Sequence, residues 1–173
     1  MAFLGQLCGF DASSLDLLQR VLLACDGTLT DTLEAALLEP IVLHKISLNI
    51  APAGIAIAAL EVDAGSEIME RTILLRGQTS GRNYVYAESL LVLDRLPAGF
   101  RKDLIESNVP LGRLWSEHRL ETWKELLSVQ RGRMGALAQY FAGNDADVLT
   151  RQYRVISSGR PLMLITESFP VVY

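Results

Sequence analysis

The C-terminal stretch Arg160 to Pro170, RPLMLITESFP, constrains the fold more than any other part of this sequence. Its large apolar side chains follow one another at the density of an interior β-strand, and Glu167 lies near its end. Burial disfavours the ionised form of a carboxyl group, so an acid in such a strand requires a partner or a function. We expect Arg71, in another apolar segment, to be that partner across the sheet.

Length and composition predict one domain over residues 1–173, with a loosely ordered N-terminus at residues 1–14. Half of the residues are hydrophobic, yet no apolar run approaches the ~20 residues of a membrane span, and no basic flank marks a secretory signal. Cys8 and Cys25 form neither a disulfide framework nor a metal-binding spacing. We therefore expect a cytoplasmic protein without a metal ion. The net charge of −4 argues against binding to nucleic acid or to anionic membranes.

Two helices are expected near the N-terminus. Leucines at helical spacing predict a helix from residue 15 onward, with Ser13 or Ser14 as its cap and Gly27 as its end. A second helix is expected over residues 31–38, with Thr30 or Asp31 as its cap. The segment at residues 26–30 is then a tight turn, and the backbone N–H groups that follow it can bind an anion.

The rest of the chain alternates between strand and turn signals. Strands are predicted at residues 41–50, 68–77, 83–93, 150–156 and 160–170, and weakly at 119–129, where a helix is the alternative. Helix is predicted at 97–106 and from Pro110 onward, a loop with some helix at 132–144, and strand or loop at 55–60. The second and third strands, and the last two, read as hairpins. The pattern is typical of an α+β domain with a mainly antiparallel sheet.

Several short motifs follow one another in an order that resembles a known family. They are DGTLT at residues 26–30, Arg71 ahead of the Gly81 turn, PLGR at 110–113, and GRPL at 159–162 leading into Thr166 and Glu167. This order is similar to that of chorismate pyruvate-lyase. The runs AESLLVLDRLP at 87–97 and RLET at 119–122 resemble the branch found in cyanobacteria, actinobacteria and archaea.

The resemblance implies an enzyme that converts chorismate to 4-hydroxybenzoate and pyruvate without metal or organic cofactor. It implies about six antiparallel strands, with flanking helices that enclose a ligand cavity. Arg71 corresponds to the arginine that holds the ring carboxylate, and Glu167 to the glutamate that meets the ring hydroxyl; these two are the expected catalytic residues. Substrate contacts are further expected from Leu29 on a flap, from Thr30, from the backbone of Leu111 and from Gly112. Glu88 stands where better-known lyases have an arginine linked to product release.

The chemistry of chorismate agrees with these roles. Aromatisation drives the reaction, so the protein must supply geometry and electrostatics, and an arginine fork matches a carboxylate. Glu167 is either an acid for the departing ether oxygen or an anchor for the hydroxyl. Arg154 is the first candidate for the second carboxylate, although it belongs to a set predicted to form a solvated face: Arg131, Arg133, Arg151, Arg154 and Arg160.

Other interpretations stay open at this stage. Arg71 and Glu167 fit a structural ion pair as well as a site, His44 and His118 are expected at the surface, and Trp115 and Trp123 in the core. A domain that senses a small aromatic acid, or a lyase that forms another hydroxybenzoate for secondary metabolism, is the alternative function. A downstream route to ubiquinone, glycolipid or antibiotic is equally open, as is the choice between monomer and homodimer.

Overall fold

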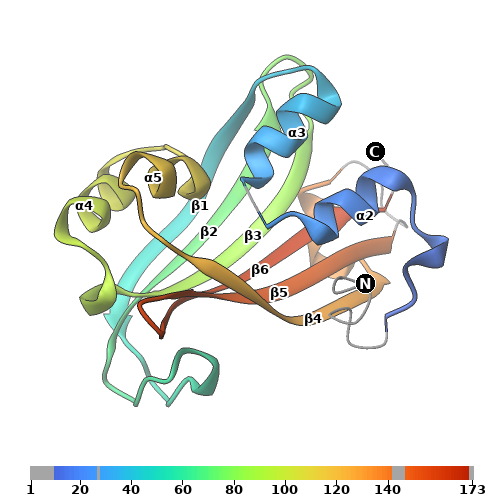
Figure 1. The fold of residues 1–173 in the computed structure, drawn as a ribbon. Coiled ribbons are helices and arrows are strands. Elements are labelled where there is room, and N and C mark those ends of the chain that lie inside the picture. The colour runs from blue at the N-terminus through green and yellow to red at the C-terminus, as the bar shows by residue number, and fades with distance from the viewer. Residues whose placement is uncertain (1–9, 27, 142–146, 172–173) are drawn as a thin grey trace.

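A curved antiparallel sheet of six strands forms the body of the computed structural model, which describes residues 10–26, 28–141 and 147–171 (Figure 1). The strands follow the spatial order β1-β2-β3-β6-β5-β4, and every neighbouring pair is antiparallel. Their bounds are β1 (Ile41–Pro52), β2 (Glu67–Gly77), β3 (Asn83–Val92), β4 (Trp123–Arg133), β5 (Asp147–Ser157) and β6 (Arg160–Pro170). The predicted α+β class and both predicted hairpins are thus confirmed. The C-terminal strand β6 lies inside the sheet between β3 and β5.

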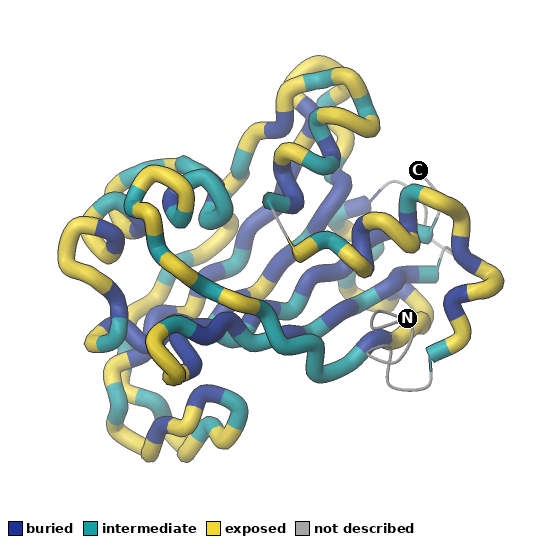
Figure 2. The backbone as a smooth tube through the Cα atoms, viewed as in Figure 1, coloured by how far each residue is buried: buried dark blue, intermediate teal, exposed yellow. Residues whose placement is uncertain are grey.

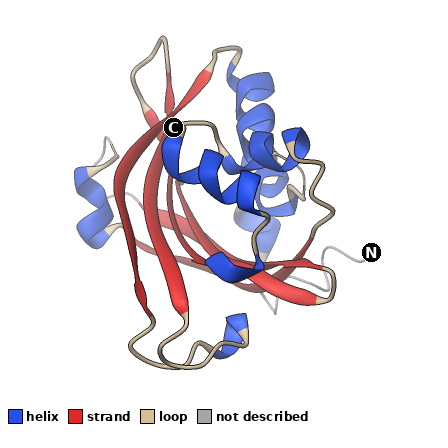
Figure 3. Ribbon diagram, turned by 90° about the vertical axis from the view of Figure 1, so that its left-hand side faces the viewer, coloured by secondary structure: helices blue, strands red, loops and turns tan. Residues whose placement is uncertain are grey.

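Four α-helices lie on the concave side of the sheet, as the view along its edge shows (Figure 3). They are α2 (Leu17–Ala24), α3 (Leu29–Leu37), α4 (Ala98–Glu106) and α5 (Leu111–Glu117). Short 3₁₀ helices occur at η1 (Ala12–Ser14), η2 (Ala58–Leu60), η3 (Leu93–Arg95) and η4 (Gly135–Gln139). None of the helices among the described residues combines the length and hydropathy that a membrane span requires.

Two hydrophobic clusters fill the space between sheet and helices, and buried residues follow the strands in Figure 2. One cluster joins β2, β3, β5 and β6 to α4 and α5, with Phe100 and Met163 fully buried at its centre. The other joins the sheet to α2 and α3 through Leu22, Leu33 and Phe169. Each such side chain contributes roughly 1.5–3 kcal/mol by leaving water. A cavity lies where the two clusters meet, lined by members of both.

The helix caps near the N-terminus differ from those predicted. Asp16 caps α2, because its side chain accepts a hydrogen bond from the Gln19 backbone N–H while the Gln19 side chain accepts one from the Asp16 backbone N–H. Thr28, and not Thr30 or Asp31, occupies the N-cap position of α3. Gly27 lies outside the described residues. Within residues 1–14, which were expected to be loosely ordered, Ala12–Ser14 form η1 with Ala12 buried; residues 1–9 are not described.

The two segments with ambiguous patterns are now resolved. Residues 119–129 are strand and not helix from Trp123 onward, because β4 pairs with β5 along its whole length. Residues 55–60 contain η2 and no long strand. The helical part expected within 132–144 is η4; residues 142–146 of that segment are not described.

Candidate active site

The cavity lies between the concave face of the sheet and the starts of α3 and α5. On the side of the helices it is covered by two segments: Thr28, Leu29 and Thr30 at the start of α3, and Pro110, Leu111, Gly112 and Trp115 at the start of α5. Its floor comes from all six strands, with Arg71, Ser89, Lys124, Tyr153 and Glu167 as the polar residues. Leu29, Thr30, Arg71, Leu111, Gly112 and Glu167, predicted from the resemblance to contact substrate, therefore all line one space.

Arg71 is the unusual residue of this cavity. Its strand places it on the concave face with Met69 and Ile73, and only 2% of it is exposed. Its Nε and one terminal nitrogen are buried and have no hydrogen-bond partner among the residues that the structure describes. Burial lowers the pKa of Arg71 to about 10, so the guanidinium stays charged at neutral pH. A buried cation with adjacent unpaired donors is the half of a bidentate pair that a carboxylate completes.

Glu167 is held by residues of the neighbouring strand and not by Arg71, which corrects the expected pairing. The Nε of Arg151 donates to one carboxylate oxygen at 2.6 Å, and the hydroxyl of Tyr153 donates to the other at 2.9 Å. The same strand register pairs Arg151 with Glu167 directly. Burial is the largest cause of the raised pKa of Tyr153, so its hydroxyl is protonated and able to donate.

Arg151 was expected on a solvated face and is instead 2% exposed. Its terminal nitrogen donates to the backbone oxygens of Leu22, Leu23 and Cys25 at the end of α2. The last carbonyls of a helix have few partners within it, and here the oxygen of Leu22 also accepts from the backbone N–H of Cys25. Arg151 thus joins Glu167 to the end of α2, just before the turn that leads to Leu29.

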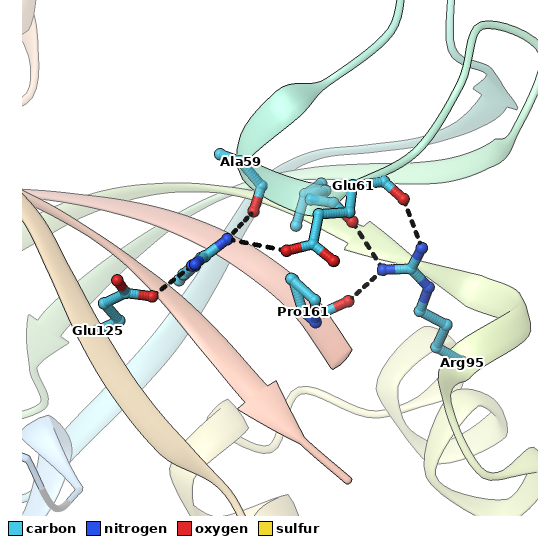
Figure 4. A network of polar contacts seen from close by, with 7 residues as sticks. Ala59, Glu61, Arg95, Glu125 and Pro161 are labelled. Atoms are coloured by element: carbon cyan, nitrogen blue, oxygen red, sulfur yellow. Dashed lines mark hydrogen bonds and ion pairs between the residues drawn. The ribbon is translucent and has the colours of Figure 1, made fainter. Parts of the chain in front are cut away.

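Arg154 lies outside the cavity, so its predicted contact with a second carboxylate is wrong. It is bonded to Glu125, to Glu61 and to the backbone oxygen of Ala59, all labelled in Figure 4. Arg95 holds the same loop through the backbone oxygens of Leu60, Glu61 and Pro161. The network fixes the loop around η2 against β6 and leaves Arg154 no role at the cavity.

Of the other residues considered in the sequence, one lines the cavity and the rest lie away from it. Trp123 is 54% exposed and is not a core residue, whereas Trp115 lines the cavity. His44 is exposed. His118 does not line the cavity, and its Nε2 lies 2.8 Å from Oδ2 of Asp103. Glu88 accepts a hydrogen bond from Tyr86 and lies with Glu70 and Thr166 on the opposite face of the sheet.

Gly112 marks the closest approach between the two covering segments. A Cβ atom at this position would lie 2.7 Å from Cγ2 and 3.0 Å from Oγ1 of Thr28. A guanidinium nitrogen of Arg113 bonds to Glu34 at 2.9 Å and so connects α5 to α3. Glycine is thus required if the segments at residues 28–30 and 110–112 are to meet over the cavity.

Comparison with known proteins decides the family. Residues 23–173 match the family model described as "Chorismate pyruvate-lyase Rv2949c-like". The chain belongs to this chorismate pyruvate-lyase family. It is 34% identical over 156 residues to a chorismate pyruvate-lyase of Mycobacterium tuberculosis, with 87% of this chain and 78% of the relative covered. It is 36% identical over 152 residues to a chorismate pyruvate-lyase of Mycobacterium leprae, of which 72% is covered.

Solved structures with the same fold include regulators. The effector domain of PhnF from Mycobacterium smegmatis matches with a TM-score of 0.63 at 13% identity, over 83% of this chain and 88% of that domain. A GntR-family transcriptional regulator from Bacillus cereus matches with a TM-score of 0.57 at 13% identity, over 75% of this chain and 90% of the regulator. At such identities the likeness concerns the fold alone, so the function of this lyase-family member must be argued from its cavity.

Proposed function

We propose that this protein is a chorismate pyruvate-lyase that releases 4-hydroxybenzoate and pyruvate from chorismate without a cofactor. The observation that carries the proposal is the buried, unpaired edge of Arg71 in the cavity that also holds Glu167. A ligand carboxylate would satisfy the unpaired nitrogens of Arg71, and membership of the family supports chorismate as that ligand.

The spacing of the two residues suits an aromatic acid. Arg71 pairs with Ser89, which pairs with Ile165, and Glu167 is two residues further along β6. Strands are ~4.8 Å apart and rise ~3.4 Å per residue, so the two Cα atoms are separated by about 12 Å. Side chains that stand roughly perpendicular to the sheet keep this separation and leave room for a six-membered ring between guanidinium and carboxylate.

We assign Glu167 to anchoring the ring hydroxyl. Both of its oxygens accept hydrogen bonds, from Arg151 and Tyr153, and an ionised carboxylate is an acceptor only. A further lone pair can accept the hydrogen bond of the substrate hydroxyl. In the reaction the ether C–O bond breaks, its electron pair leaves with the enolpyruvyl oxygen, and the hydroxyl-bearing carbon loses its hydrogen as a proton; the released enolate takes up one proton at its methylene carbon and becomes pyruvate. The electrons of that C–H bond complete the aromatic ring.

The covering segments give the reaction a water-poor site. Leu29 and Thr30 are buried residues of the first turn of α3, and Leu111 begins α5. The first N–H groups of a helix have no partner within it, so both helix starts offer donors to an anionic ligand. Exclusion of water strengthens the interactions of Arg71 and Glu167 with the substrate.

The test is to incubate the purified protein with chorismate, follow pyruvate by a coupled assay and identify the aromatic product by chromatography. Equal amounts of pyruvate and 4-hydroxybenzoate are expected. Arg71→Leu should abolish binding of substrate and product, whereas Glu167→Gln should lower kcat more than it changes KM. Absence of turnover, with tight binding of 4-hydroxybenzoate, would contradict the proposal and favour an aromatic-acid sensor; a different aromatic product would identify another lyase.

A further inference from the structure

A second cation, Lys124, lines the same cavity from the opposite side. It comes from β4, and its Nζ lies 5.8 Å from the ring centre of Trp115 and 5.2 Å from that of Tyr153. Burial is the largest cause that lowers its pKa, and the charge of Glu167 acts in the other direction. The ammonium is thus held among aromatic faces in a partly desolvated place, where an added anion interacts strongly.

Trp115 supplies an unpaired donor beside it. Its indole Nε1 is buried and lacks a hydrogen-bond partner within the described part of the chain, although the residue lines the cavity. Buried tryptophan nitrogens usually find a partner. A ligand oxygen in the cavity would provide one, and the contact of Lys124 with the Trp115 ring places the two donors together.

The sheet order separates this pair from Arg71. Glu167 is on β6; Arg71 on β2 and Lys124 on β4 are each two strands away, in opposite directions. The cavity therefore has one acid in the middle and a cation on either side. Such an arrangement fits a ligand with a hydroxyl at its centre and carboxylates at two ends.

A second, more polar cavity continues beyond Lys124. Lys124 and Tyr153 line both cavities, and the second one adds Cys25, Asp26 and Arg151. One terminal nitrogen of Arg151 is buried without a hydrogen-bond partner in residues 10–26, 28–141 and 147–171. An unpaired guanidinium donor on this side gives an anionic arm a favourable direction in which to extend.

We propose that Lys124 Nζ and Trp115 Nε1 bind the enolpyruvyl carboxylate of chorismate, with the arm directed toward the second cavity. This inference rests on the proposed function, because it takes the ligand to carry a second carboxylate. 4-Hydroxybenzoate has only the ring carboxylate, so it does not use this subsite. Substrate and product therefore depend differently on Lys124, and the difference can be measured.

The experiment compares kcat/KM for chorismate with the Kd of 4-hydroxybenzoate, measured by calorimetry. Lys124→Met should lower kcat/KM by about 10- to 100-fold, the value of a charge-assisted hydrogen bond, and leave the product Kd within about twofold. Trp115→Phe should lower kcat/KM by about 2- to 10-fold, the value of a neutral bond, with the same unchanged Kd. Lys102→Met, on the exposed side of α4, and Trp123→Phe, at an exposed position, are the matched controls.

Two outcomes would overturn the subsite. In the first, Lys124→Met weakens 4-hydroxybenzoate binding by as large a factor as it lowers kcat/KM for chorismate. In the second, Lys124→Met leaves both quantities unchanged. Retained product binding also shows that a variant is folded. If the wild-type protein releases no pyruvate, the proposed function is wrong, and the Kd of chorismate itself for wild type and Lys124→Met then decides the subsite. If chorismate does not bind the wild-type protein, both proposals are wrong.

Discussion

Replacement of Arg151 by methionine tests how the site is built. Arg151 connects three parts of the molecule, because its guanidinium bonds to Glu167 on β6 and to three carbonyl oxygens at the end of α2. The side chains of Arg151 and Glu167 are 3% and 9% exposed, so water replaces neither partner easily. Methionine keeps the length and apolar stem of arginine but removes every donor.

The expected loss of stability follows from this burial. Removal of one partner from a buried ion pair costs about 3–5 kcal/mol, because the other charge is left without compensation. Unpaired carbonyls at the end of α2 act in the same direction. Since domains of this size are stable by about 5–15 kcal/mol, Arg151→Met should remove a large part of the free energy of unfolding.

Urea unfolding followed by circular dichroism measures the effect. The double variant Arg151→Met/Glu167→Gln should be more stable than Arg151→Met by about 1–3 kcal/mol, because it leaves no unpaired charge. Arg131→Met is the matched control on the neighbouring strand. Its ion pair with Asp147 is partly exposed and should contribute only ~0–1 kcal/mol. A loss below about 1 kcal/mol in Arg151→Met, or a double variant no more stable than the single one, would refute the reasoning.

Two further predictions concern the covering segments and the effect of pH. Gly112→Ala should weaken 4-hydroxybenzoate binding about tenfold, as measured by calorimetry, since the new methyl group displaces Thr28 from its place over the cavity. The double variant Gly112→Ala/Thr28→Ser lacks Cγ2, the nearest atom, and should recover part of the lost affinity. Hydrogen bonds from Ser80, then Tyr84, lower the pKa of Glu39 from 4.5 to about 2. Because the folded pKa is the lower one, this stabilisation is complete above about pH 4.5 and is lost as pH falls toward 2. The melting temperature of Glu39→Gln should therefore lie below that of wild type at pH 7, and the gap should close in acid; a constant gap would contradict the assignment.

The strands were predictable because each buries at least one face, and β6 buries nearly all of its residues. Alternation of apolar and polar residues identified β1 and β5, and runs rich in apolar residues identified β2, β3 and β6; the hairpins followed from the turns between them. Helix caps were less predictable, since several polar residues compete near each start and the backbone geometry selects one. Asp16 competed with Ser13 and Ser14, and its capping box with Gln19 is a signal that the sequence does contain.

The charged residues of the site follow the same alternation, and this signal was missed. Arg151 lies an even number of residues from Tyr153 and Val155 along β5, so its side chain is on their buried face. Arg154 lies an odd number of residues away and points to the other side. Lys124 likewise lies two residues from Leu126 along β4, so the two side chains are on the same face of the sheet. Which buried charge pairs with which cannot be read from parity, because it depends on strand order. The chain brings β6 between β3 and β5, and only this order makes Arg151 the neighbour of Glu167.

Charge arrangement offers a physical distinction between a lyase and a sensor on this fold. A sensor for an aromatic monoacid requires one cation in its cavity, and Arg71 alone meets that need. Lys124, two strands beyond Glu167 on the other side, is a second cation whose pKa is lowered by burial, so a further anion beside it is favoured. Under the proposed function chorismate satisfies both cations, and the product satisfies only Arg71. Departure of pyruvate then removes the enolpyruvyl carboxylate from Lys124. The product lacks this attraction, so renewed binding of chorismate is favoured over retention of the product.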